Sequence, residues 1–154
     1  MSPEALAQHL GERRRTDALN VVLANGCFDV LHVGHLRYLL AARAEGDLLV
    51  VGVNDDSTVR KLKGQGRPVF PASARAEMVA ALSPVHFVTI FPEPTADHLI
   101  RLLRPDVHCK GTDYAGGVPE AATVRDVGAR MAIVGGPKDH HSHDILDKIR
   151  VAPQ

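Results

Sequence analysis

The sequence of 154 residues contains no tryptophan, and only 4% of its residues are aromatic, although 45% are hydrophobic. Aliphatic side chains must therefore build most of the core, and the length suits one domain. The formal net charge is zero, which argues against a broad electrostatic surface for nucleic acid or for a membrane. The sequence also lacks a signal-peptide pattern and any apolar run long enough to span a bilayer.

Cysteine is scarce as well. Cys27 and Cys109 are the two cysteines of the sequence, too few for a disulfide framework. We therefore expect a protein of the reducing cytoplasm, in which both thiols act as small buried hydrophobic groups.

Short apolar runs alternate along the chain with segments of helical periodicity. We expect strands at 20–24, 48–53, 85–91, 107–110 and 131–134. We expect helices, several of them after capping residues such as Ser73 and Thr95, at 2–12, 33–45, 54–62, 73–82, 95–103, 120–130 and 142–150. This alternation predicts an α/β fold with a parallel sheet. The domain prediction is one unit over 1–154, with an N-terminal helix and loop at 1–19 and a core at 20–150.

The chemistry is concentrated at the end of the first expected strand, where residues 25–35 read N-G-C-F-D-V-L-H-V-G-H. This pattern predicts a strand, a tight turn and the first turn of a helix. His32 and His35 are then neighbours on the helix surface, and Gly34 lets a ligand approach the backbone. Free N–H groups and the positive end of the helix dipole attract anions, so the site suits phosphate.

Other polar residues are expected at the same edge of the sheet. Asn25, Asn54, Lys110 and Gly135 follow strands and should line the rim where such sheets bind ligands. Lysines and an arginine also flank a loop over 63–71 that contains glycine and proline. Arg75 lies in the first turn of a helix, where a cation is unfavourable, which is a mild indication of function.

The 25–35 string resembles the H-x-G-H signature of the nucleotidyltransferase superfamily, in particular its cytidylyltransferase-like branch. The resemblance extends over about 20–150 through the strings V-N-D-D-S-T-V-R-K-L-K-G, R-A-E-M and R-P-D-V-H-C-K-G-T-D-Y. K-L-K-G-x-G-R-P and K-G-x-D-Y are similar to the heptose-phosphate adenylyltransferases of that superfamily. The resemblance implies a single Rossmann-like domain, with five parallel strands in the order 3-2-1-4-5 flanked by helices.

The reaction that this resemblance implies is nucleotidyl transfer. A phosphate oxygen of D-glycero-D-manno-heptose 1-phosphate attacks the α-phosphorus of ATP, or of CTP, and pyrophosphate leaves. The step needs alignment and charge stabilisation rather than a protein nucleophile. The resemblance also implies Mg²⁺ on the triphosphate, no metal bound by the protein alone, and a homodimer.

The resemblance assigns roles to individual residues. The catalytic residues that it implies are His32, His35, Lys63 and Arg75. Besides the two histidines, the nucleotide-binding residues that it implies are Asn25, Gly26, Cys27, Phe28, Gly34, Lys110, Gly111, Asp113, Ser142 and His143. The substrate-binding residues that it implies are Asp29, Asn54, Lys61, Lys63 and Arg67.

The sequence departs from the family pattern in two places. The family usually begins its last helix with a Ser/Thr pair, whereas this chain reads D-H-H-S-H-D over 139–144. His140, His141 and His143 could contact phosphate, bind a transition metal or form a solvated turn. The second departure is His86, at a position where the family often has an acid.

Other functions stay open at this point. Within the same chemistry the alternatives are a glycerol-3-phosphate cytidylyltransferase and an FAD synthetase-type adenylyltransferase. A nicotinamide dehydrogenase would require G-x-G-x-x-G after the first strand, which is absent. A non-catalytic nucleotide-binding regulatory module would need neither H-x-G-H nor the basic loop.

Overall fold

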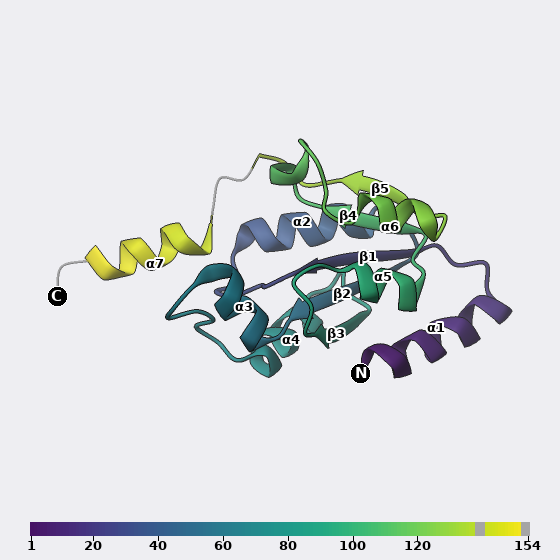
Figure 1. The fold of residues 1–154 in the computed structure, drawn as a ribbon, viewed down its shortest axis with the longest axis horizontal. Coiled ribbons are helices and arrows are strands. Elements are labelled where there is room, and N and C mark those ends of the chain that lie inside the picture. Colours follow the sequence, from purple (N-terminus) through teal and green to yellow (C-terminus); the bar gives the residue numbers. More distant parts are fainter. Residues whose placement is uncertain (138–140, 152–154) are drawn as a thin grey trace.

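A five-stranded parallel sheet forms the centre of the structure, a computed structural model that describes residues 1–137 and 141–151 (Figure 1). Its strands are β1 (Val21–Gly26), β2 (Leu48–Asn54), β3 (Phe87–Phe91), β4 (Val107–Lys110) and β5 (Arg130–Ile133). They lie in the order β3-β2-β1-β4-β5, and each neighbouring pair is parallel. The predicted fold class and strand order are confirmed.

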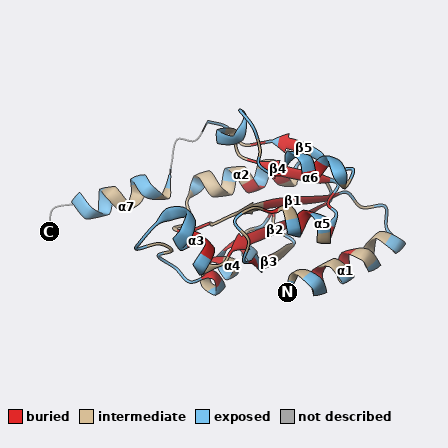
Figure 2. Ribbon diagram, in the orientation of Figure 1, coloured by how far each residue is buried: buried red, intermediate tan, exposed pale blue. Residues whose placement is uncertain are grey.

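Helices connect the strands and cover both faces of the sheet. They are α1 (Pro3–Thr16), α2 (Val33–Arg43), α3 (Asp56–Lys63), α4 (Ala72–Ala80), α5 (Asp97–Leu103), α6 (Ala121–Asp126) and α7 (Ser142–Val151), with a 3-10 turn η1 (Thr112–Tyr114) after β4. No helix in the described ranges combines the length and the apolar character that a membrane crossing requires. Helix α7 projects from the body and has no buried residue (Figures 1 and 2).

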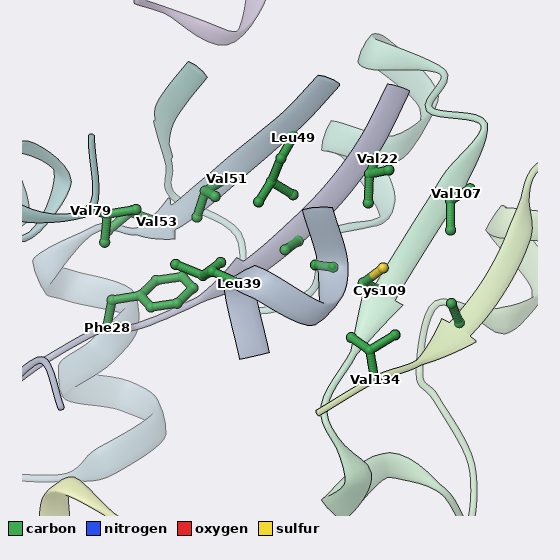
Figure 3. Packing of buried hydrophobic residues seen from close by; sticks show 13 residues of the cluster. Val22, Phe28, Leu39, Leu49, Val51, Val53, Val79, Val107, Cys109 and Val134 are labelled. Carbon is green, nitrogen blue, oxygen red and sulfur yellow. The ribbon is translucent and has the colours of Figure 1, made fainter. Parts of the chain in front are cut away.

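Aliphatic side chains fill a core on each face of the sheet, as the low aromatic content predicts. Val22 and Ala24 of β1 face the core under α2 and α4, whereas Val21 and Leu23 face the core that includes α1 and α5. Figure 3 shows the first of these cores, where side chains from β1, β2 and β4 meet Leu39 of α2. Every residue of the inner strand β2 is buried, which matches its continuous apolar sequence.

The first helix is longer than predicted. The expected end near Glu12 is wrong, because α1 continues to Thr16. The guanidinium of Arg14 donates to the main-chain carbonyls of Leu103 and Arg104 at distances of 3.1 and 2.6 Å. This long-range contact holds the last turn of α1 against the end of α5.

Three other predicted helix boundaries are also wrong. Neither Ser73 nor Thr95 caps a helix, since α4 starts before the first and α5 starts after the second. The Thr95 hydroxyl donates to the carboxylate of Asp97 instead, at 2.6 Å. The helix expected over 120–130 stops early, and Gly128 follows it with φ of 77°. A left-handed residue of this kind commonly ends a helix.

His86 has a structural role at the start of β3. Its imidazole Nδ1 accepts a hydrogen bond from the main-chain N–H of Leu49 at 3.1 Å. The main-chain N–H of His86 donates to the Leu49 carbonyl at 3.0 Å. The imidazole therefore extends the sheet hydrogen bonding beyond the end of the strand. This contact gives a structural reason for the histidine at this position.

Candidate functional site

The turn between β1 and α2 is tightly bent. Phe28 and Val30 both have positive φ, at 50° and 52°, on either side of Asp29. Such a conformation is costly for residues other than glycine and often occurs at functional sites. The Phe28 ring is buried in the core, and its centroid lies 5.5 Å from that of the His35 ring. A Cβ at Gly26 would lie 3.2 Å from this ring, which explains the glycine.

His32 and His35 cap the start of α2 with their imidazole rings. Nδ1 of His32 accepts from the N–H of Gly34, and Nδ1 of His35 accepts from the N–H of His32, both at 3.1 Å. The ring centroids are 3.9 Å apart. Because Nδ1 is an acceptor in each ring, the neutral rings carry their protons on Nε2. Two N–H donors are thereby fixed side by side at the helix N-terminus.

The carboxylate of Asp29 holds the basic loop against this turn. It accepts hydrogen bonds from Arg67 Nε (2.8 Å), the Val69 N–H (2.8 Å) and the Phe70 N–H (3.1 Å). Burial raises the pKa of Asp29, but these hydrogen bonds outweigh burial, so its pKa is lowered overall. Asp29 was expected to bind the phosphate substrate, and in this structure its oxygens are used within the protein.

Arg75 lies behind the site rather than on its surface. Its side chain is 1% exposed and donates to the Cys27 carbonyl (2.6 Å), the Phe70 carbonyl (2.9 Å) and Asp56 Oδ1 (2.8 Å). The same Asp56 oxygen accepts from the N–H of Ala72 at 2.8 Å. In this structure the guanidinium therefore contacts protein acceptors, and the contact between Arg75 and phosphate stays a prediction. Arg75 joins the turn, the loop and two helices.

The basic loop presents exposed cations beside the turn. Lys61 and Lys63 are exposed at the end of α3, and Gly64 and Gly66 follow with φ of 93° and 82°. Burial raises the pKa of the Cys27 thiol, and the charges of Lys63, Arg75 and Arg67 oppose this shift. Lys63 therefore places an exposed positive charge close to the turn, where it would attract a polyphosphate.

Asn54 supports the same region from the end of β2. It is 3% exposed, its amide donates to the Glu93 carbonyl at 3.0 Å, and its oxygen accepts from the Cys27 thiol at 3.9 Å. Its side chain therefore links the turn to the loop after β3. Both cysteines were expected to be buried. Cys109 is fully buried, and burial raises its pKa to about 12, whereas Cys27 is only partly buried.

The end of β4 forms the opposite side of the rim. Lys110 is buried, with its Nζ 3.3 Å from Glu120 Oε1 and 4.7 Å from the centroid of the Tyr114 ring. Gly111 begins the η1 turn, and Asp113 is exposed within it. The structure thus brings the K-G-T-D-Y string to the sheet edge that carries the β1 turn. Neither Glu120 nor Tyr114 was among the predicted site residues. Glu120 was expected in the first turn of a helix over 120–130, where an acidic residue is ordinary.

The start of α7 meets the turn through Ser142. Its hydroxyl donates to the main-chain carbonyls of Asp29 and Val30. His143 points along α7 instead, with Nε2 3.1 Å from Asp147 and 74% of the side chain exposed. Within the described residues, no group of histidine, cysteine and carboxylate side chains is placed to bind a metal ion. His140 lies outside the described residues.

Known proteins resemble the chain in sequence and in structure. A family model described as Cytidylyltransferase-like matches residues 23–149. The bifunctional protein HldE of Pseudomonas paraeruginosa is 42% identical over 142 residues, which cover 90% of this chain and 30% of that protein. HldE of Geobacter sulfurreducens is 45% identical over 130 residues, which cover 84% and 26% respectively. The chain therefore spans less than a third of these curated relatives.

A solved structure supports the same relationship. The crystal structure of a lipopolysaccharide core biosynthesis protein from Thermoplasma volcanium matches with a TM-score of 0.64 and 27% identity, covering 77% of this chain and 98% of the other. The fold, the H-x-G-H turn and the family model agree. The chain belongs to the cytidylyltransferase-like family of nucleotidyltransferases.

Proposed function

We propose that this protein transfers the AMP group of ATP to D-glycero-D-manno-heptose 1-phosphate. A phosphate oxygen of the sugar attacks the α-phosphorus, the bond from that phosphorus to the bridging oxygen breaks, and pyrophosphate leaves. The observation that carries the proposal is the histidine pair, whose Nδ1 atoms accept main-chain N–H groups at 3.1 Å and whose neutral rings therefore carry Nε2–H donors.

Such donors suit the chemistry because they need no rearrangement when charge develops on the phosphoryl oxygens. The N-terminal end of α2 adds a favourable dipole at the same place. Lys61 and Lys63 supply exposed cations for the triphosphate, and Arg67 stays with Asp29 to keep the loop in position. The protein thus provides alignment and electrostatic stabilisation.

The choice of substrates rests on the sequence strings and on the names of the relatives. K-L-K-G-x-G-R-P and K-G-x-D-Y are similar to heptose-phosphate adenylyltransferases. The solved relative is named for lipopolysaccharide core biosynthesis, a process that consumes activated sugars. The proposal includes Mg²⁺ carried by the triphosphate, since Mg²⁺ prefers phosphate and water oxygens. It also includes one domain over 1–154 and a homodimer, which light scattering would test.

The decisive assay measures pyrophosphate release with Mg²⁺. ATP, CTP and GTP are each combined with heptose 1-phosphate, glycerol 3-phosphate and FMN. The key variants are His32→Asn and His35→Asn, because an asparagine oxygen can replace Nδ1 as the cap but supplies no donor at the Nε2 position. His98→Asn, on the exposed surface of α5, is the matched control.

We expect release with ATP and heptose 1-phosphate, and a loss of about 10²–10³-fold in kcat for either site variant with an unchanged melting temperature. The control should retain full activity. Release with another pair would change the substrate and keep the mechanism. A folded protein that binds no nucleotide would overturn the proposal.

A further inference from the structure

A buried polar cluster lies beneath the end of β4, on the face covered by α5 and α6. His108 and Lys110 alternate with the apolar residues of this strand and are 0% and 6% exposed. Glu120, which directly precedes α6, is 1% exposed. Lysine and glutamate are seldom buried to this degree in a sheet interior unless they are paired.

The cluster is poorly arranged for stability alone. Oε2 of Glu120 is buried without a hydrogen-bond partner among the described residues, and the buried ring nitrogens of His108 have no side-chain partner there, only a contact with the main chain of Leu23. An unsatisfied buried polar group costs about 1–3 kcal/mol. A buried ion pair contributes little compared with apolar residues of the same size. A function that requires the ammonium group in this place is the better explanation.

The geometry fixes that ammonium group from two sides. Oε1 of Glu120 lies 3.3 Å from Lys110 Nζ and also accepts the N–H of Ala96 at 3.0 Å, so the carboxylate is itself anchored to the start of α5. The Tyr114 ring lies 4.7 Å from Nζ on η1. Burial, Asp113, Glu120 and Cys27 all raise the pKa of Tyr114.

We propose that Glu120, assisted by Tyr114, is a positioning residue that holds Lys110 for contact with the nucleoside triphosphate. The inference deepens the proposed function, because it assigns Lys110 to the nucleotide and not to the acceptor. Glu120 touches neither substrate in this assignment and acts only through the lysine. Its carboxylate also prevents the lysine from turning outward into solvent.

A double-mutant cycle on nucleotide affinity tests this assignment. Glu120→Gln keeps the side-chain volume and an acceptor for the Ala96 N–H but removes the charge. Binding of ATP with Mg²⁺ is measured by calorimetry for wild type, Glu120→Gln, Lys110→Met and the double variant. Asp126→Asn is the matched control, because Asp126 is an exposed acid on α6, the helix that Glu120 precedes. Thermal unfolding verifies the fold of each protein.

We expect Glu120→Gln and Lys110→Met each to weaken ATP binding about tenfold, and the double variant to bind no more weakly than Lys110→Met alone. If Glu120→Gln does not fold, Tyr114→Leu replaces it in the same cycle, with the same non-additivity expected. Additive losses, or wild-type affinity in the single variants, would overturn the assignment.

The assay with all acceptors separates this inference from the proposed function. If the wild type releases pyrophosphate but Glu120→Gln binds ATP as tightly as the wild type, the positioning role alone is rejected. A non-additive cycle without release from any acceptor would reject the proposed reaction and retain the positioning role. Failure of the wild type to bind any nucleotide would reject both.

Discussion

Replacing Asp29 by asparagine tests whether this carboxylate holds the basic loop against the β1–α2 turn. Asp29 is 1% exposed and accepts three hydrogen bonds, one of them from Arg67. Each hydrogen bond to a charged group contributes about 1.5–3 kcal/mol, and asparagine keeps one acceptor oxygen while turning an NH₂ toward donors. The loss of one or two bonds predicts a decrease of about 2–4 kcal/mol in the free energy of unfolding.

The measurements are urea unfolding at pH 7 and hydrogen exchange at the Val69 and Phe70 amides, which should become faster in Asp29→Asn. Asp17→Asn is the control, because that carboxylate is exposed and its ion pair with Arg13 contributes little. The pKa of Asp29 is lowered on folding, so its contribution is present above the ordinary value of 3.8 and is lost as pH falls through the lower folded value. The difference between the variant and wild type should therefore shrink in acid.

A different result would refute this role for Asp29. If the carboxylate served only to contact a substrate, Asp29→Asn would leave the unfolding free energy unchanged or raise it, as often happens when an active-site charge is removed. Amide exchange at Val69 and Phe70 would also match wild type. Either outcome would show that the Asp29 carboxylate does not hold the basic loop against the turn.

Three further predictions concern the interior. Arg75→Met should lower the free energy of unfolding by about 3–5 kcal/mol in urea titrations, because it removes three hydrogen bonds and leaves the carbonyls of Cys27 and Phe70 without this donor; wild-type stability would contradict this structural role. Burial and Lys110 lower the pKa of His108 to about 4, so the melting temperature should rise with pH between 4 and 6.5. In His108→Leu this rise in melting temperature should be smaller. Gly52→Ala should cost about 1–3 kcal/mol by calorimetry, because its Cβ would lie 2.8 Å from Leu99; a neutral result would mean that the core rearranges.

The sequence predicts the elements better than their ends. β4 was predicted at its observed bounds, because Pro105 ends the preceding helical pattern and Gly111 begins a turn directly after Lys110. Boundary errors occurred where long-range contacts override local preference, as where Arg14 prolongs α1. The strand order came from family resemblance, since hydrophobic periodicity carries no information about which strands are neighbours.

At the candidate site, too, local patterns are predicted from the sequence and long-range contacts are not. The H-x-G-H spacing indicates two imidazoles at a helix start, and the structure places them there. Residue type alone could not show that Arg75 and Asp29 turn inward, because a cation or a carboxylate near phosphate-binding glycines is equally compatible with solvent or ligand contact. Apart from Phe70, which is five positions from Arg75, their partners lie 19 to 48 positions away, and single-sequence patterns carry no information at such separations.

The imidazole caps of α2 affect which substitutions evolution can accept at these two positions. Active-site residues commonly reduce the stability of the protein that carries them, so chance replacements can gain stability while they abolish activity. At His32 and His35 the Nδ1 atoms accept main-chain N–H groups, while the Nε2 atoms are the donors proposed for catalysis. Most replacements would leave those main-chain N–H groups without an acceptor. Selection for a stable fold and selection for a working site therefore act in the same direction at these two positions.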